Sequence, residues 1–397
     1  MKFGPFYELQ VPRPWDHESE HRLVQNSLDQ VELCDRLGFD CVWATEHHFL
    51  EEYAHNSAPE VFLAACSQRT KNIRIGHGIV QLPPAVNHPA RVAERIAMLD
   101  LVSNGRVEFG TGAGASEAEL AGFLVTQEEK KAMWAEALEA IVRMFVEDPF
   151  RGYEGKYFKM PPRNVVPKTY QKPHPPMWQA CSRNDSILQA ARLGLGAMTL
   201  SFPVPEEVRP WVKNYRDALE NECAPVGSRV TTQFGVSLPF LCVRDEKQIE
   251  QVAAEGFKFF VHALGHYAIF GHHVPGTTNI WQNFQAKARE ALVPKGWQSS
   301  CVGTPEMLRK RLRDFEDAGV DQIICLSQAG NISHETLCES FELFAKEVMP
   351  EFKEREAKRA RERAESDARI WEKGLARKPK VAVPDAAPAP IPAAGHR

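Results

Sequence analysis

Apolar runs of strand length alternate with stretches of helical periodicity along nearly all of this 397-residue chain. Short apolar runs bounded by turn residues indicate strands, and apolar residues that recur every three or four positions indicate helices. The predicted strands are Lys2–Leu9, Phe39–Thr45, Ile73–Leu82, Arg106–Gly110, Met177–Cys181, Gly196–Phe202, Gln233–Val243 and Asp321–Ser327. The predicted helices that follow them are Ser19–Leu37, Ser57–Arg69, Pro89–Leu101, Gln127–Phe145, Asn184–Leu193, Glu206–Glu222, Pro305–Ala318 and His334–Val348. Eight such βα units predict a TIM (β/α)8 barrel, because doubly wound sheets rarely need that many.

Three segments lie outside this regular alternation. Residues 245–300 follow the seventh strand and are predicted to be an insertion, with an active-site lid and a subunit contact as its alternative roles. Residues 351–373 are highly charged and predict a helical extension, whereas residues 374–397 are rich in alanine and proline and predict a disordered tail. We therefore expect a single barrel domain over residues 1–350.

The composition limits the classes of partner. Apolar residues make up 43% of the chain and charged residues 25%, which is enough apolar material for a sizeable core. The net charge of −4 comes from intermixed signs, with no basic stripe that could neutralise a phosphate backbone. No apolar run approaches the ~20 residues needed to cross a bilayer, and residues 1–10 lack the features of a secretory signal. We expect a cytoplasmic protein with neither a nucleic-acid nor a membrane partner.

Candidate functional residues gather where the predicted strands end, which is where the active sites of TIM barrels form. The second strand runs into Glu46, His47 and His48; the third carries His77, Gly78 and Ile79; the fourth ends in a loop with Gly110 and Gly112; and the fifth is followed by Ser182, Arg183, Asn184, Asp185 and Ser186. Four further histidines follow the seventh strand, namely His262, His266, His272 and His273.

The histidines raise the question of a metal site, since hydrolytic barrels often bind zinc through histidine. His47 and His48 are adjacent, and adjacent residues of a strand point to opposite faces, so both cannot bind one ion unless the strand has ended. The early strands carry no H-x-H pair. We therefore expect no metal site; a non-catalytic alternative has one of the two histidines hydrogen-bonded in the barrel mouth and the other in a structural role.

The loop after the fourth strand runs from Gly110 to Ala115 and fits the G-x-G-x-x-A pattern of dinucleotide-binding folds. Its context disfavours that interpretation, because the strand is the fourth rather than the first. In addition, Glu117 and Glu119 would set carboxylates where a pyrophosphate should lie. We expect instead that Gly110 and Gly112 let the backbone approach a planar ring system closely.

The segment from Ser182 to Ser186 lies between the fifth strand and its helix. Main-chain N–H groups at a helix start, two hydroxyls, the amide of Asn184 and the guanidinium of Arg183 together suit a phosphate monoester. Ordinary N-capping by Ser182 or Asn184 would explain the same residues without a ligand. Both interpretations stay open at this point.

Several runs of the chain resemble, in order and spacing, bacterial luciferases and luciferase-like monooxygenases. These runs are Phe39–Phe49, Arg69–Gly76, Leu82–Pro83, His88–Arg91, Gly105–Gly110, Gly303–Glu306 and Asp317–Asp321. Each run is weak alone, but together and in order they are specific, and the likeness spans roughly residues 1–350. The chain departs from the luciferases where Gly112 and Ala113 replace their cysteine and arginine, so we expect Arg183 to supply the phosphate charge instead.

The resemblance implies a barrel that binds reduced FMN, or in some branches the deazaflavin F420, at the carboxyl ends of its strands. By the family pattern, His47 matches the functional histidine beside the flavin, with Glu46 and His48 as its neighbours. Gly78–Ile79 matches a non-proline cis peptide beneath the ring system, next to His77, and Ser182–Ser186 matches the phosphate-binding loop. A histidine that titrates near neutrality would suit proton transfer there.

The resemblance also implies the reaction. Reduced FMN and O2 would form a C4a-(hydro)peroxide that oxygenates a small apolar carbonyl or aromatic substrate. NAD(P)H would supply the electrons indirectly, through a separate flavin reductase, and two copies would pair as a homodimer through the helices after strands two and three. The alternatives are an F420-dependent oxidoreductase of the same superfamily and a non-catalytic flavin-binding subunit. The identity of the substrate is left open.

Overall fold

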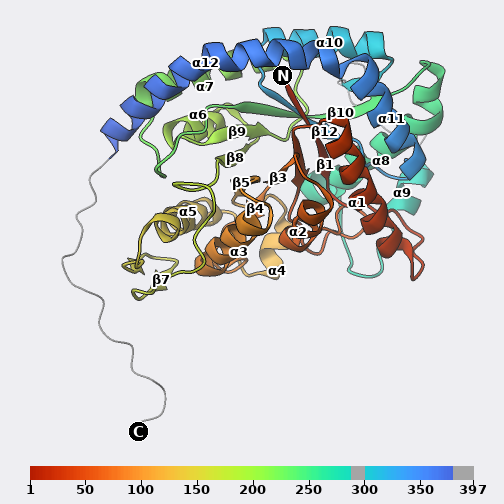
Figure 1. Ribbon diagram of the computed structural model, residues 1–397. Helices are drawn as coiled ribbons and strands as arrows, with labels where there is room; N and C mark the ends of the chain where they lie inside the picture. Colours follow the sequence, from red (N-terminus) through yellow and green to blue (C-terminus); the bar gives the residue numbers. More distant parts are fainter. Residues whose placement is uncertain (288–299, 379–397) are drawn as a thin grey trace.

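A closed barrel of eight parallel strands forms the centre of the protein in the computed structural model, which describes residues 1–287 and 300–378 (Figure 1). In order around the barrel, the strands are β1 (Lys2–Tyr7), β2 (Cys41–Ala44), β3 (Arg74–His77), β5 (Val107–Gly112), β8 (Met177–Cys181), β9 (Gly196–Thr199), β10 (Phe234–Cys242) and β12 (Gln322–Leu326). The barrel closes where β12 pairs with β1, with Phe3 opposite Ile323. The predicted TIM barrel is confirmed.

Helices surround the barrel in the predicted order. They are α1 (Ser19–Leu37), α2 (Pro59–Arg69), α3 (Pro89–Val102), α5 (Lys130–Val146), α6 (Asn184–Arg192), α7 (Pro205–Glu222), α10 (Pro305–Asp317) and α11 (His334–Glu347). Among the described residues, no helix is both long and apolar enough to cross a membrane. The irregular connection before β8 holds a small hairpin, β6 (Tyr153–Glu154) and β7 (Lys159–Met160).

The third predicted strand is interrupted. It consists of β3 and of β4 (Val80–Gln81), which pairs with β5, and Gly78 and Ile79 separate the two pieces. The cis peptide bonds among the described residues all precede proline, so the predicted cis bond between Gly78 and Ile79 is wrong for this structure. Such a bond costs about 3 kcal/mol when no proline is involved.

A short helix that the sequence did not indicate follows β5. This helix, α4 (Glu117–Gly122), comes directly after the glycine-containing segment. Gly110 and Gly112 themselves belong to β5 rather than to a loop. The extended backbone of β5 therefore brings α4 to the carboxyl end of the barrel, close to the end of β2.

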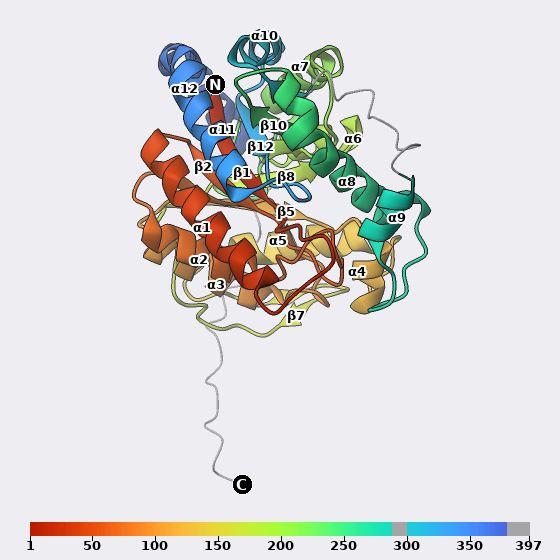
Figure 2. The same cartoon turned by 90° about the vertical axis from the view of Figure 1, so that its right-hand side faces the viewer.

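The insertion after β10 is largely helical. It contains η1 (Ile249–Ala253), α8 (Ala254–Gly265), η2 (His266–Phe270) and α9 (Ile280–Lys287), and it leads to β11 (Cys301–Gly303). Part of the predicted lid, residues 288–299, lies outside the described residues. The buried carboxylate of Glu52 accepts hydrogen bonds from the N–H groups of Ile280 and Trp281, at 2.6 and 3.0 Å, and η2 contacts α4. The insertion therefore docks beside the loop after β2 (Figure 2).

The charged C-terminal run forms one helix, α12 (Met349–Arg377), which lies along α7 (Figure 1). Residues 374–377, which were predicted to belong to the disordered tail, are helical. They are ordered because Gly374 packs closely on Cys223 and Pro225, while Arg377 donates to the carbonyl oxygen of Glu220. The rest of the predicted tail, from residue 379 onward, lies outside the described residues.

Candidate active site

His47 lies just beyond β2, at the carboxyl end of the barrel, between two carboxylates. Its Nδ1 donates to Oε1 of Glu119 at 3.0 Å, and its Nε2 forms an ion pair with Oε2 of Glu8 at 3.2 Å. The His47 side chain is 19% exposed, whereas the Glu119 side chain is fully buried. Both ring nitrogens are therefore engaged by carboxylates from other elements, and the ring is held in one orientation.

The negative charges of Glu119 and Glu8 change the pKa of His47. Burial alone would lower the pKa of His47, but the carboxylates of Glu119 and Glu8 outweigh it and raise that pKa well above the usual value of 6.5. Burial of Glu119 favours a raised pKa for its carboxyl group. The charge of His47 and three hydrogen-bond donors, from His47, His48 and Gln81, outweigh burial and lower that pKa below its usual value. The two carboxylates therefore shift the titration of His47 upward from the predicted neutral range and favour its imidazolium form over the neutral ring.

Glu119 and Glu8 are each held by further donors. Oε1 of Glu119 also accepts from the backbone N–H of His48 at 3.0 Å and from Nε2 of Gln81 at 2.8 Å. Glu8 follows β1 and accepts from the hydroxyl of Thr45 at 2.8 Å and from the hydroxyl of Tyr53 at 3.3 Å. Several donors therefore converge on each of these two buried carboxylates. The sites of negative charge around His47 are thus built into the fold.

The side chains of Glu46 and His48 contact each other on the opposite face of this segment from the side chain of His47. Oε1 of Glu46 contacts Nε2 of His48 at 3.0 Å and accepts from Nδ2 of Asn87 at 2.6 Å. Oε2 of Glu46 accepts from the backbone N–H of Gln81 at 2.8 Å. The side chains of His47 and His48 therefore have different partners, as expected for neighbours that point in opposite directions. Among the described residues, no group of three or more metal-binding side chains is placed to hold an ion.

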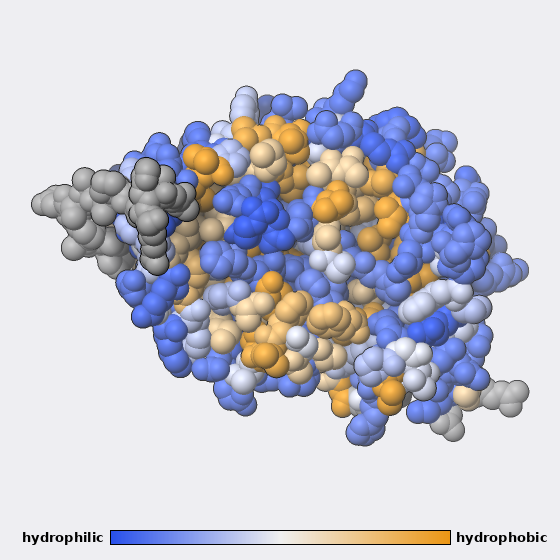
Figure 3. All heavy atoms as spheres, turned by 90° about the horizontal axis from the view of Figure 1, so that it is seen from below, coloured by the Kyte–Doolittle hydropathy of each residue, from blue (hydrophilic) through white to orange (hydrophobic). Residues whose placement is uncertain are grey.

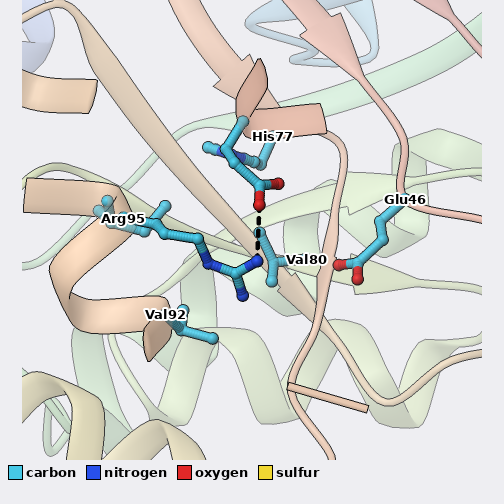
Figure 4. Close-up of a pocket in the computed structure, with 7 residues that line it drawn as sticks. Glu46, His77, Val80, Val92 and Arg95 are labelled. Atoms are coloured by element: carbon cyan, nitrogen blue, oxygen red, sulfur yellow. Dashed lines mark hydrogen bonds and ion pairs between the residues drawn. The ribbon is translucent and has the colours of Figure 1, made fainter. Parts of the chain in front are cut away.

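His77 points out of the barrel. It is 1% exposed, lies 6.5 Å from the ring of Phe109, and lines a cavity of water-molecule size together with Glu60, Arg95 and Glu46 (Figure 4). Burial lowers the pKa of His77 to about 4, so this imidazole is neutral. Because neighbouring strand positions alternate between faces, Gly78 rather than His77 faces the barrel interior. This position does not support the predicted contact between His77 and a cofactor.

The glycines of the mouth accommodate other parts of the chain. A Cβ atom at Gly112 would lie 2.8 Å from Cδ1 of Ile79, and one at Gly110 would lie 2.0 Å from the carbonyl oxygen of His77. A Cβ atom at Gly78 would lie 3.2 Å from the ring of Phe6. In this structure, Gly110 and Gly112 therefore make room for His77 and Ile79, and the approach of a planar ring to these glycines stays a prediction.

The segment after β8 is exposed at the same end of the barrel. The side chains of Ser182 and Arg183 are open to solvent, and α6 begins at Asn184. The hydroxyl of Ser186 accepts from the backbone N–H groups of Ser182 and Arg183, both at 3.2 Å. The capping group is therefore Ser186, rather than Ser182 or Asn184, and the guanidinium of Arg183 is left facing solvent beside a helix N-terminus.

An aromatic cover lies next to His47, formed by Tyr53, Phe202, Phe260 and Tyr267. The ring of Tyr53 lies 5.6 Å from that of His47, 5.4 Å from that of Phe260 and 6.4 Å from that of Tyr267. Phe260 belongs to α8 and Tyr267 to η2, so the insertion supplies half of this cover. Its rings place an apolar surface beside His47.

Sequence reasoning missed Glu8, Glu119, Gln81 and Tyr53. Glu119 was noticed only as a residue that would repel a pyrophosphate. The one signal for Glu8 is a carboxylate at the end of a strongly apolar strand, since such a residue is rarely buried unless it is paired. No local pattern identifies Glu119, which lies 72 residues from its partner.

The fold and the site define an enzyme of the α/β-barrel class, with its titratable groups at the carboxyl ends of the strands. The model of the family described as luciferase-like monooxygenase matches residues 1–322. The chain therefore belongs to the luciferase-like monooxygenase family.

Named relatives are monooxygenases. The oxygenase component of the flavin-dependent trigonelline monooxygenase of Acinetobacter baylyi is 25% identical over 361 residues, which are 89% of this chain and 96% of that protein. The monooxygenase RslO1 of Streptomyces bottropensis is 27% identical, with a TM-score of 0.73 over 89% of this chain and 100% of that one. The chain is accordingly a monooxygenase.

Two more distant structures share the fold. The oxygenating constituent of 3,6-diketocamphane monooxygenase of Pseudomonas putida, solved in complex with FMN, has a TM-score of 0.68 at 19% identity, over 88% of this chain and 98% of that one. An F420-dependent secondary alcohol dehydrogenase has a TM-score of 0.66 at 19% identity, over 87% of this chain and 98% of that one. The fold is therefore common to enzymes of both flavin types.

We predict that Glu119→Gln lowers the pKa of His47, because the substitution removes one of the two carboxylates that stabilise the imidazolium. NMR titration of the imidazole signals measures this, and the His47 signal is assigned by its absence in His47→Gln. Glu117→Gln, on the same short helix but exposed, is the matched control. An unchanged His47 titration in Glu119→Gln would contradict the assignment.

The ion pair of His47 and Glu119 makes its contribution to the stability of the fold depend on pH. The raised pKa of His47 gives stability that is complete below 6.5 and is lost as the pH rises through the folded value. The lowered pKa of Glu119 gives stability that is complete above 4.5 and is lost as the pH falls through the folded value. The pair therefore contributes fully between pH 4.5 and 6.5, and Glu119→Gln should destabilise the fold most in that window.

Proposed function

We propose that this chain is the oxygenase component of a two-component monooxygenase, which uses reduced FMN and O2 to oxygenate a small apolar carbonyl or aromatic substrate. A separate flavin reductase would supply the reduced flavin from NAD(P)H. The observation that carries the proposal is the carboxylate-held imidazolium of His47 at the mouth of the barrel, beneath the aromatic cover. The relatedness to the trigonelline monooxygenase component supports the two-component arrangement.

The residues present fit a flavin phosphate. Exposed Arg183, the hydroxyl of Ser182 and the N-terminus of α6 provide a cation, a hydroxyl donor and a helix dipole at the carboxyl end of β8. These are the groups that a phosphate monoester selects, and they lie at the same end of the barrel as His47. Arg183, Ser182, Asn184 and Ser186 would hold the phosphate, with Gly78 and Ile79 nearer the ring system.

Reduced FMN, when bound, supplies the electrons with which dioxygen is activated. The chain's own residues supply the proton and the dry surroundings. The two carboxylates favour the protonated form of His47, so the ring would serve as a proton donor rather than as a proton acceptor, with both ring nitrogens held by Glu119 and Glu8. A proton given up by the ring would leave it neutral, and Glu119 and Glu8 would still hold its orientation through Nδ1 and Nε2, while Tyr53 packs beside it and against Phe260.

The insertion would act as a lid in this scheme. Its α8 and η2 contribute Phe260 and Tyr267 to the aromatic cover, and the hydroxyl of Tyr267 donates to the carbonyl oxygen of Glu51 at 3.0 Å. Substrate that reaches His47 must pass or displace these rings. If the insertion were a subunit contact instead, its aromatic rings beside His47 would have no role in the reaction.

The test of the function is turnover with an NAD(P)H-dependent flavin reductase and a panel of carbonyl and aromatic compounds, with oxygen uptake scored against free hydrogen peroxide. We predict oxygenated product, and a loss of turnover by ~100-fold or more in His47→Gln, because the positioned proton donor is removed. A non-catalytic flavin-binding subunit would show no product and no effect of His47→Gln. Turnover with F420 in place of FMN would favour the F420-dependent alternative.

We predict that Arg183→Ala raises the Kd for FMN by about tenfold or more and leaves the Kd for riboflavin unchanged, because only FMN carries the phosphate. Quenching of flavin fluorescence measures both constants. Arg192→Ala, at the other end of α6, is the matched control, since Arg192 pairs with Glu222. An equal loss of affinity for FMN and riboflavin would mean that Arg183 does not contact the phosphate.

We also propose a homodimer formed through α2 and α3. Val61 on α2 is 67% exposed, and Met98, Leu101 and Val102 on α3 are 51, 37 and 39% exposed. Figure 3 shows apolar side chains gathered in patches on the face of the molecule that carries these helices. Apolar patches on a protein surface mark contact sites.

We predict that Leu101→Asp converts the dimer to monomers, because a carboxylate would be buried without a partner. Light scattering measures the mass in solution. Leu375→Asp is the matched control, because Leu375 is similarly exposed, at 39%, but lies on α12. Wild-type protein that is monomeric at micromolar concentration would remove the homodimer.

A further inference from the structure

Arg95, on α3, links α2 to the segment that leads into α3. Its Nη1 donates to Oε1 of Glu60 at 2.6 Å, and its Nη2 donates to Oδ1 of Asn87 at 2.5 Å. In Figure 4 the guanidinium of Arg95 and the carboxylate of Glu46 point toward the same space beside Val80. The Arg95 side chain is 30% exposed and is the outermost member of a group of polar residues that continues inward.

The contact with Arg95 decides which way the Asn87 amide faces. A side-chain amide has an acceptor end and a donor end, and the guanidinium can only donate, so it holds the oxygen. The donor end is thereby turned inward, where Nδ2 of Asn87 donates to Oε1 of Glu46 at 2.6 Å and to the carbonyl oxygen of Gln81 at 3.0 Å. A reversed amide would set its oxygen against the Glu46 carboxylate.

The chain of contacts continues from Glu46 to His47. Oε2 of Glu46 accepts from the backbone N–H of Gln81 at 2.8 Å, and Nε2 of Gln81 donates to the Glu46 carbonyl oxygen at 3.0 Å. The same Nε2 donates to Oε1 of Glu119 at 2.8 Å, which accepts from Nδ1 of His47. Asn87, Glu46, Gln81 and Glu119 are all buried. In a buried network each member limits the orientation of the next.

We propose that Arg95 is a positioning residue for His47, acting through the ordered amides of Asn87 and Gln81 and the carboxylates of Glu46 and Glu119. The inference rests on the proposed role of His47 in oxygenation. The network transmits orientation rather than a proton, because the guanidinium only donates hydrogen bonds and the two side-chain amides neither gain nor lose a proton. His77, beside the guanidinium, is neutral and cannot replace its charge.

The sign of one titration separates positioning from simple electrostatics. Removal of a cation would by Coulomb's law alone stabilise the His47 imidazolium and raise its pKa. If Arg95 instead orders the network, its removal frees Asn87, loosens Gln81 from Glu119 and weakens the hold of Glu119 on His47. The pKa of His47 would then fall. The charged groups that face His47 directly are Glu119 and Glu8, and the ionisable Tyr53 and His48 lie beside it.

The experiment compares wild type, Arg95→Ala and Arg91→Ala, all as full-length protein. Arg91 lies one turn earlier on α3, is exposed and pairs with Glu94, so it is the matched control. NMR titration of His47 in flavin-free protein should show a lower midpoint in Arg95→Ala and no change in Arg91→Ala. In the reductase-coupled reaction, kcat should fall about tenfold with KM and FMN affinity unchanged, since misplacement of a reacting group acts on the chemical step.

A raised or unchanged His47 midpoint in folded Arg95→Ala would overturn the proposal. Asn87→Ser gives an independent test, because it removes the amide but leaves Arg95 and Glu60 paired, and its His47 midpoint should also fall. Circular dichroism verifies that both variants are folded. A lowered midpoint in protein that forms no oxygenated product would reject the proposed function but leave the positioning role intact.

Discussion

The site depends on one interaction, the burial of the His47 imidazolium between Glu119 and Glu8. Removing two carboxylates and an imidazole from water is costly, and the cost is offset only when charges and hydrogen bonds are satisfied together. Here Oε1 of Glu119 receives three donors while its Oε2 is buried without a hydrogen-bond partner, and Glu8 receives Thr45 and Tyr53 in addition to His47. Removal of one of the three charged groups would leave a buried charge without its partner. His47, Glu119 and Glu8 therefore depend on one another for their positions.

The barrel makes this interaction available because closure brings strand ends together. Glu8 follows β1 and His47 follows β2, and these strands are neighbours in the sheet. Glu119 arrives from the far side of β3, on a short helix that begins five residues after β5 ends. The interruption of the third strand at Gly78 and Ile79 places Gln81 where it can contact Glu46 and Glu119 at once. The interruption of the third strand and the short helix after β5 thus build the polar side of the mouth.

The fold was predictable from the sequence because each strand and helix carries its own periodicity, and eight βα units have few arrangements. The order of the strands, most helices and the long C-terminal helical run follow from that pattern. The site was predictable only in part. Residues such as His47 and Arg183 stand at strand ends and could be found from position alone. The outward direction of His77 follows from alternation, but only once the exact strand ends are known.

The sequence by itself determined the number of βα units, the end of the barrel at which polar groups gather and the family to which the chain belongs. Only the tertiary structure decided which side chains meet: that His47 lies between two carboxylates, that Ile79 lies against Gly112, and that Glu119 is a partner of His47. The physical reason is range. Periodicity specifies how one element buries its own face, whereas a buried charge depends on groups that lie up to 72 residues away in the chain and come together only when the barrel closes.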